Sequence, residues 1–315
     1  MSTLQLRGPA RVVARQQRGA LWAACALVVL GIAFVIGLRT WVATTPENCA
    51  DGDTTRCGDS TYLPTYARSA SQTYLAGGGT ALLVLSVLIG VFVAGPLIAR
   101  ELENGTFRFA WAQSVPPARW LAARLALPAV LATAAMTVLL LVYRWGRTGV
   151  QGDSPYELHW SQSGVFPALG PVVVAYALFA VAVGALCAVL VRRTLPAMGL
   201  TAVVLTVVMY GFGKRRYELW PTVRDLGENA WSDSSWPIES GMLTPSGKEL
   251  HWKDCFTRGN PGPDCLRDQG GVTNFVDHHP PSHFWPLQLV ETGILLALAA
   301  GAVALAFRIL RRHHA

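Results

Sequence analysis

Six long apolar segments separated by polar connections dominate this sequence. They cover residues 20–41, 75–98, 121–143, 166–191, 196–212 and 285–307. A helix needs roughly 20 apolar residues to cross a bilayer, and a chain in lipid must satisfy its backbone hydrogen bonds internally. The composition agrees, since 52% of the residues are hydrophobic and only 14% are charged. The sequence therefore predicts an all-α integral membrane protein with six transmembrane helices, placed in the plasma membrane.

The positions of Lys and Arg predict how these helices are oriented. Positive residues in short connections favour the cytoplasmic side. Arg residues gather in 1–19, 99–120, 192–195 and 308–315, which we therefore place in the cytoplasm, with 42–74, 144–165 and 213–284 outside. Both termini are then cytoplasmic, and a large extracellular domain lies between helices five and six. Lys214, Arg215 and Arg216 oppose this arrangement, but their connection is long and counts little in the rule.

The first cytoplasmic segment has the spacing of an amphipathic helix. Arg7, Arg11, Arg15 and Arg18 recur every three or four residues, which places them on one helical face. Such a face can bind the phosphates of membrane lipids, or it can contact a cytoplasmic partner. The sequence leaves both interpretations open.

The cysteines predict two local disulfides on the extracellular side. Cys49 and Cys57 share segment 42–74, and Cys255 and Cys265 share segment 213–284. Pairs outside the cytoplasm usually oxidise, and neither spacing matches a zinc module. A metal site with His251 or His278, or among Asp277, His278, His279 and His283, is the weaker alternative. We predict no metal site and no cofactor on this chain.

A polar segment between the second and third apolar segments carries the most distinctive residues. Glu101 and Glu103 are the acidic residues of a cytoplasmic face that is otherwise rich in Arg. Gly105 permits a turn, and Thr106 can cap a helix that begins at Phe107. Phe107 and Trp111 then offer apolar side chains to a groove on a partner. Alternatively, the two carboxylates pair with Arg100, Arg108 or Arg119, and the aromatic rings lie at the membrane interface.

Two motifs resemble those of a known family. Residues 101–115 fit the pattern Glu-x-Glu-x-Gly-Thr-x-Arg-x-Ala-Trp-x-Gln-Ser-Val, and residues 279–293 read His-Pro-Pro-Ser-His-Phe-Trp-Pro-Leu-Gln-Leu-Val-Glu-Thr-Gly. Both resemble segments of ABC-2 type transporter permeases, most closely those of actinobacteria. The chain departs from the pattern at Pro116 and Pro117, where such permeases more often have a polar or basic pair.

The resemblance implies a transporter made of several chains. Segment 99–120 would be a coupling loop that docks on a separate ABC ATPase through Glu101, Glu103, Gly105, Thr106, Phe107 and Trp111. Two ATPase copies would bind ATP and Mg, and a second permease, identical or paralogous, would complete an exporter. The substrate would be amphipathic or drug-like.

Sequence patterns for catalysis by this chain are missing. It has no Gly-x4-Gly-Lys-Ser/Thr phosphate loop, no Gly-x-Ser-x-Gly and no His-Glu-x-x-His. We therefore predict that it is not an enzyme. The net charge of +7 reflects the cytoplasmic membrane surface, so nucleic acid is not an expected partner. A membrane sensor or immunity protein that binds an extracellular ligand through 213–284 is the alternative function.

Glu291 is the unusual residue of the last apolar segment. A carboxylate within a span is costly and is a functional-site hypothesis by default. Glu291 can line a translocation path or hold an outer gate with Gln288 or with Lys214, Arg215 and Arg216. Equally, it can reach the outer interface one turn below Trp285.

Overall fold

The computed structural model describes most of the chain and divides it into two compact units. The described residues are 18–46, 48–49, 62–63, 66–106, 116–150, 158–227, 234–257 and 264–312. The helical unit comprises Met1–Gly213 and Glu291–Ala315, and the sheet unit comprises Lys214–Val290. A two-stranded ladder, β1 (Asn48–Cys49) with β2 (Tyr62–Leu63), lies outside the helices.

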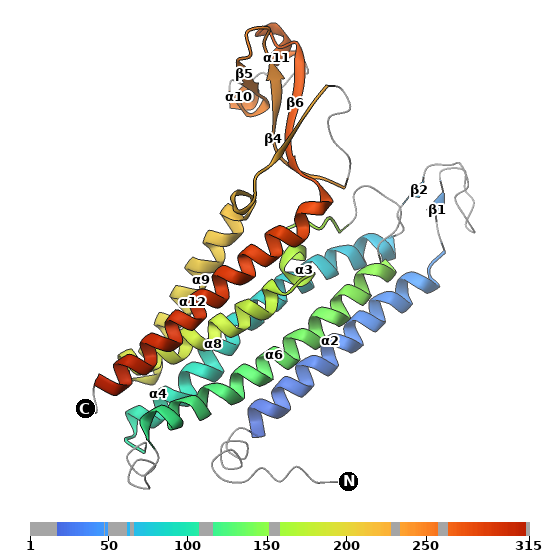
Figure 1. Ribbon diagram of the computed structural model, residues 1–315. Coiled ribbons are helices and arrows are strands. Elements are labelled where there is room, and N and C mark those ends of the chain that lie inside the picture. Colours follow the sequence, from blue (N-terminus) through green and yellow to red (C-terminus); the bar gives the residue numbers. More distant parts are fainter. Residues whose placement is uncertain are drawn as a thin grey trace. The chain divides into compact units, whose positions relative to one another are not determined.

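Long apolar helices and a few short helical segments build the helical unit (Figure 1). They are α2 (Arg18–Thr44), α3 (Tyr66–Leu88), the π-helix η1 (Ile89–Ala94), α4 (Gly95–Glu103), α6 (Pro117–Val150), α7 (Val165–Ala168), α8 (Val172–Val191), α9 (Thr194–Arg215) and α12 (Phe284–Arg312). Because α3, η1 and α4 are continuous, six helical stretches of the described chain are long and apolar enough to cross a membrane. The prediction of six apolar helices agrees with this architecture.

The helix limits differ from those expected at several ends. Most helices extend past their apolar segments, as α6 does from Pro117 to Val150 where we expected 121–143. Polar residues continue a helix readily once its backbone hydrogen bonds are established. The segment expected at 166–191 is instead interrupted, because α7 ends at Ala168 and α8 begins at Val172. Gly170 and Pro171 lie in the break, where they favour a turn.

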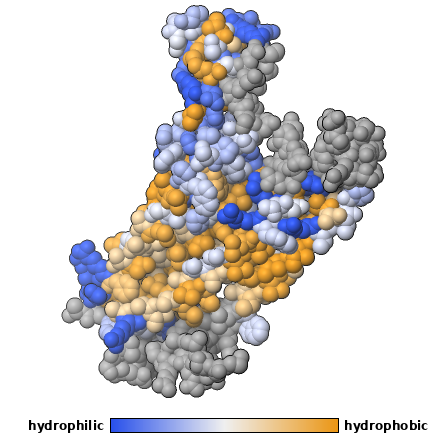
Figure 2. All heavy atoms as spheres, turned by 45° about the vertical axis from the view of Figure 1, so that its right-hand side comes forward, coloured by the Kyte–Doolittle hydropathy of each residue, from blue (hydrophilic) through white to orange (hydrophobic). Residues whose placement is uncertain are grey.

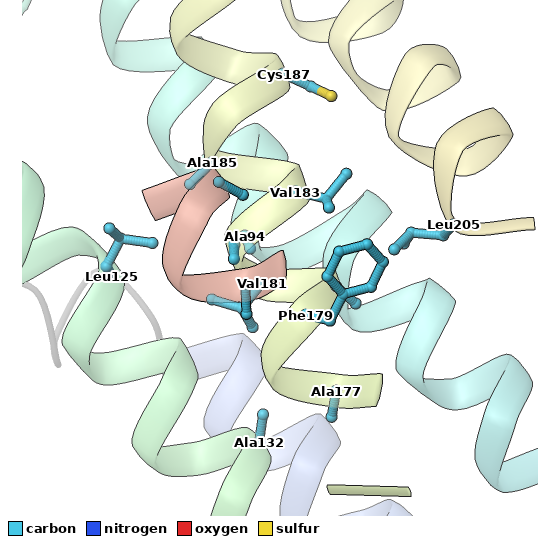
Figure 3. Close-up of a cluster of buried hydrophobic side chains, with 14 of the residues drawn as sticks. Ala94, Leu125, Ala132, Ala177, Phe179, Val181, Val183, Ala185, Cys187 and Leu205 are labelled. Carbon is cyan, nitrogen blue, oxygen red and sulfur yellow. The ribbon is translucent and has the colours of Figure 1, made fainter. Parts of the chain in front are cut away.

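Helix α8 forms the centre of the helical unit. It carries no charged residue, and its side chains are buried on nearly every face, as expected for a helix that is apolar all round. It packs against η1, α3, α4 and α6. Figure 3 shows Ala94 of η1, Leu125 of α6 and Leu205 of α9 around the part of α8 that holds Phe179 and Val181.

Glycines bring η1 and α8 into backbone contact. A Cβ added at Gly90 would lie 2.7 Å from the carbonyl oxygen of Ala180, and one added at Gly184 would lie 2.6 Å from the carbonyl oxygen of Gly90. Small residues of this kind allow helices to pack closely in membranes. The π-helix has a local cause as well, since Gly95 donates its N–H to Gly90 and the next residue, Pro96, has no N–H to donate.

The sides of the helical unit expose apolar side chains. Leu30, Phe92, Val130, Val203 and Val207 are each more than half exposed. Figure 2 shows hydrophobic residues spread over this surface. Water would penalise so extensive a patch, whereas lipid tails would not.

The sheet unit is a four-stranded antiparallel sheet with two short helices. Its strands are β3 (Val223–Leu226), β4 (Trp236–Leu243), β5 (Glu249–His251) and β6 (Thr273–His279), in the order β3-β6-β4-β5. The register places Val223 opposite His278 and Trp236 opposite His279. Helices α10 (Trp252–Thr257) and α11 (Cys265–Asp268) follow β5. The expectation of an all-α protein therefore missed this sheet.

A disulfide lies in the core of the sheet unit. Cys255 and Cys265 are bonded, which confirms the predicted pair, and they pack with Met242, Leu250 and Leu266. The second predicted pair, Cys49 with Cys57, falls outside the residues whose side chains the structure describes. Cys25 and Cys187, which lie in apolar helices, are not disulfide-bonded.

Charged side chains cross the surface of the same sheet. Arg224 on β3 donates to both carboxylate oxygens of Asp277 on β6, at 2.7 Å each, and also pairs with Glu249 on β5. Its guanidinium lies 4.5 Å from the ring centre of Phe275. The hydrogen bonds from Arg224 lower the pKa of Asp277 and of Glu249. Both acids therefore stabilise the folded sheet at neutral pH, and this contribution is lost as the pH falls through their folded-state pKa values.

Reduction of the disulfide should loosen the sheet unit and leave the helical unit folded. A loop with a sequence separation of 10 is stabilised by about 2–3 kcal/mol when it is closed. The Cys255→Ser/Cys265→Ser variant should therefore be cleaved faster by protease within 214–290, while cleavage of the helices stays unchanged. Equal cleavage of the variant and the parent protein would contradict a stabilising role.

Removal of Arg224 should make the sheet unit less dependent on pH. In Arg224→Gln the two carboxylates regain ordinary pKa values, so the parent protein should exceed the variant in stability at neutral pH. The difference should shrink as the pH falls below about 4. The rate at which a phosphine reduces the buried Cys255–Cys265 bond, measured across this range, reports the opening of the unit. A difference that stays constant with pH would contradict the assignment.

Candidate functional site

The described residues that flank the predicted coupling segment lie at one end of the helical unit. The ends of α4 and α12, the starts of α2 and α6, and the turn between α8 and α9 all meet this end (Figure 1). Residues 99–106 and 116–120 are described on either side of the segment. Phe107 and Trp111, the predicted apolar anchors, lie outside the described residues. The contacts made by the flanking residues therefore define the site.

Glu101 joins α4 to α6. The indole Nε1 of Trp120 donates to Glu101 Oε2 at 3.0 Å, and the guanidinium of Arg124 forms an ion pair with Glu101 Oε1. The three side chains are largely shielded from solvent, and a charged hydrogen bond is stronger there than in water. The intrachain partners named from the sequence were Arg100, Arg108 and Arg119, and Arg124 was not considered. The position of Arg124 one turn from Trp120 is the signal that was missed.

Glu103 joins α4 to the start of α9. Its Oε2 accepts hydrogen bonds from the backbone N–H of Thr194 at 2.9 Å and from the Thr194 hydroxyl at 2.6 Å. Unpaired N–H groups and the helix dipole both favour a carboxylate at a helix N-terminus. The turn before it is tight, since Arg192 ends α8 in the left-handed conformation with φ of 57°. Glu103 thus caps a helix about ninety residues away in sequence.

Gly105 and Thr106 shape the end of α4. Gly105 has φ of +69°, which a residue with a side chain rarely adopts, and it follows directly after the last helical turn. Thr106 donates its hydroxyl to the carbonyl of Glu101 at 3.4 Å. The helix that Thr106 was expected to cap would begin at Phe107, which lies outside the described residues. The turn at Gly105 is present, and the cap stays a prediction.

Glu291 is fully buried in the helical unit. The hydroxyl of Tyr176 on α8 donates to Glu291 Oε1 at 2.6 Å, and the Tyr176 ring meets Phe212 of α9 edge-on. Both interpretations of Glu291, a translocation path or gate and the outer interface, stay predictions. Thr292 on the same helix has a buried hydroxyl with no hydrogen-bond partner in the described residues. Gln288 is buried as well. Tyr176 is the partner that sequence reasoning missed, although few polar groups interrupt the apolar run of α8.

Two histidines of the sheet unit, His279 and His283, form hydrogen bonds. The Nε2 of His279 lies 2.9 Å from the carbonyl oxygen of Tyr217, so this nitrogen carries a proton. Its Nδ1 lies 3.1 Å from His283 Nδ1 and accepts the proton of that ring. Burial lowers the pKa of His279, which keeps it neutral. Within the described ranges no three potential ligands come together to hold a metal.

Loss of the Glu101–Arg124 pair should destabilise the helical unit by more than the two separate substitutions explain. We expect Glu101→Gln and Arg124→Gln to show a coupling free energy of roughly 1–3 kcal/mol in a double-mutant cycle. Denaturant titration of the purified protein in one detergent measures it. Glu103→Gln combined with Arg124→Gln is the matched control and should be additive. Additivity in both cycles would mean that the pair contributes little.

A comparison with known families identifies the family of the chain. The chain matches a family model described as ABC-2 membrane transporter related over residues 19–215. No curated protein and no solved structure matches the chain. The matched region runs from α2 to α9, covers more than half of the 315 residues and contains Glu101, Glu103 and Thr194. Proteins of this kind are membrane subunits of transporters, and the six apolar helices fit a multi-pass membrane protein. The chain belongs to the ABC-2 membrane transporter related family.

Proposed function

We propose that this chain is the permease subunit of an ATP-driven exporter, and that a separate ABC ATPase docks at segment 99–120. The observation that carries the proposal is the pair of carboxylates on α4. Glu101 holds α6, and Glu103 holds the start of α9. A partner that displaces this segment therefore acts on three helices at once. Two ATPase copies, with ATP and Mg bound to them, and a second permease would complete the assembly.

The positive charge at this end of the helical unit indicates on which side of the membrane the ATPase binds. Cationic side chains flank its helix ends: Arg100, Arg119, Arg192, Arg193, Arg308, Arg311 and Arg312. By the positive-inside rule this end faces the cytoplasm, where ATP is available. The disulfide of the sheet unit supports an extracellular position for Lys214–Val290, because such bonds persist in oxidising surroundings.

In the proposed mechanism, ATP binding closes the ATPase pair and shifts the 99–120 segment. The shift passes to α3 through the continuous helix α3–η1–α4, to α6 through Glu101 and to α9 through Glu103. The ATPase biases the permease only if its contacts differ between the two states. A rigid connection at these carboxylates converts that difference into a movement of several spans.

Docking should depend on the aromatic residues of the segment. Phe107→Ala/Trp111→Ala should lose co-purification with the ATPase encoded nearest to this chain, since buried aromatic anchors dominate most interfaces. The matched control, Trp285→Ala, removes an exposed aromatic side chain far along the sequence and should retain the ATPase. Retention of the ATPase by the double variant would contradict docking at this segment. If the parent protein also binds no ATPase, the sensor or immunity function would be favoured.

Transmission should depend on Glu103 separately from docking. Thr194→Val removes the hydroxyl that donates to Glu103 and keeps the shape of the side chain. We expect this variant to bind the ATPase normally and to lose the acceleration that the permease imposes on ATP hydrolysis. The rate of phosphate release from the reconstituted complex, compared with that of the ATPase alone, measures this effect. Unchanged acceleration would show that transmission does not require the hydrogen bond from the Thr194 hydroxyl to Glu103.

A further inference from the structure

His279 and His283, here called the histidine pair, connect the first and last segments of the sheet unit. These segments are the 3-10 helix η2 (Arg216–Leu219) and the end of β6 with the 3-10 helix η3 (Pro281–His283). The two Nδ1 atoms lie 3.1 Å apart, and His279 Nε2 lies 2.9 Å from the carbonyl oxygen of Tyr217 on η2. The proposed coupling mechanism does not use this contact.

Two tryptophan rings pack on the histidine pair. The His279 ring lies 5.5 Å from the Trp236 ring, and His283 meets Trp220 edge-on with their centres 6.5 Å apart. His279 is fully buried, and this burial lowers its pKa. The surroundings therefore favour a neutral imidazole.

The ionisable groups that act on the pair are positive when charged. His278 acts electrostatically on both rings, and His283 also acts on His279. Arg216 on η2 is buried and carries a permanent charge. A proton added to His279 would therefore meet like charge.

The carboxylates close to the pair in sequence do not bond to it. Glu218 on η2 is exposed, and Asp277 on β6 binds Arg224 through both oxygens. Asp225 lies 3.7 Å from the Nε2 of the neighbouring ring, His278. A proton on His278 would gain this carboxylate as a partner, whereas the pair has its hydrogen bonds to Tyr217 and within itself.

Hydrogen-bond geometry limits how many protons the closed pair can hold. The two Nδ1 atoms share one N–H, so one of them must act as the acceptor. One extra proton is compatible with this bond, because an imidazolium can donate to a neutral ring. With two extra protons both Nδ1 atoms are donors and both rings are positive. Separated rings accept both protons once the pH falls below about 6.5, the ordinary pKa of histidine.

We propose that the histidine pair is an acid-sensitive contact, which holds η2 on the end of β6 at neutral pH and releases it in mildly acidic surroundings. The open form binds at least one proton more than the closed form, so acid favours opening by about tenfold per pH unit below about 6.5. The stabilisation is fully present above this pH and is lost as the pH falls. The proposal concerns the sheet unit alone, goes beyond the transport function and requires no ATPase.

Hydrogen–deuterium exchange of the full chain in lipid nanodiscs, with a chelator present, tests the proposal. From about pH 7.5 to about pH 5.5, exchange corrected for its intrinsic pH dependence should accelerate roughly 10-fold in peptides from 214–222 and 276–284. Peptides from 248–256 should change little. Arg224 lowers the pKa of Glu249 and of Asp277, so both acids stay ionised over this range. An equal rate at both pH values in 214–222 and 276–284 would overturn the proposal.

Two variants locate the response. His279→Gln supplies one donor and one acceptor that do not titrate in this range, so it should keep its protection at both pH values. His251→Gln is the matched control, because His251 Nδ1 lies 3.1 Å from Glu239 and its protonation would form an ion pair. This control should respond to acid as the parent protein does. A response that survives in His279→Gln, or one that is lost in His251→Gln, would contradict the assignment to the pair.

A measurement on the parent protein tests the same site without any substitution. Mass spectrometry of hydrogen exchange at the imidazole Cε1 follows the protonation of each histidine. His279 should protonate at a lower pH in the folded chain than in the denatured chain, because its buried ring resists a charge. Equal protonation in the two forms would overturn the proposal. An acid response that appears only without the chelator would overturn it too, since it would indicate a shared metal ion.

Discussion

The close contact between η1 and α8 is the constraint on which the helical unit depends. Gly90 and Gly184 let two backbones approach where any side chain would collide with a carbonyl oxygen. Helix packing in lipid gains little from the hydrophobic effect, so close van der Waals contact must supply most of the stability. Helix α8 can therefore be apolar on every face, because neighbouring helices cover it. This contact holds η1, which lies near the middle of the continuous helix α3–η1–α4, against α8.

Three carboxylates of the helical unit each join two helices. Glu101 pairs α4 with α6, Glu103 pairs α4 with α9, and Glu291 pairs α12 with α8. Polar groups in a span are tolerated where they bond to one another. Those at the end of the unit lie beside a proposed partner surface, whereas Glu291 lies within a span. The same type of side chain thus serves two parts of the structure in different surroundings.

Sequence patterns predicted the spans well because their cause is local. Long apolar runs have one stable form in lipid, and Gly105 and the 192–195 turn were found from residue preferences. The partners of the carboxylates were not predictable in this way, since Thr194 is about ninety residues from Glu103. The sheet escaped detection because β3 is exposed along its length and β4 shows no regular alternation of buried and exposed residues. The disulfide needed only the number and spacing of cysteines.

Glu101 and Glu103 already bond to residues of this chain, and this limits how a docking partner can bind the segment. Had Glu101 and Glu103 been free, basic residues on an ATPase would have been the natural complement. Both are instead bonded within the chain, and capture by a partner would first require loss of the contacts with Arg124 and Thr194. That loss would leave Arg124 partly buried without its counter-ion, which is unfavourable. Affinity for the ATPase should therefore come from the apolar part of the segment, while the carboxylates keep the helices together as the partner moves.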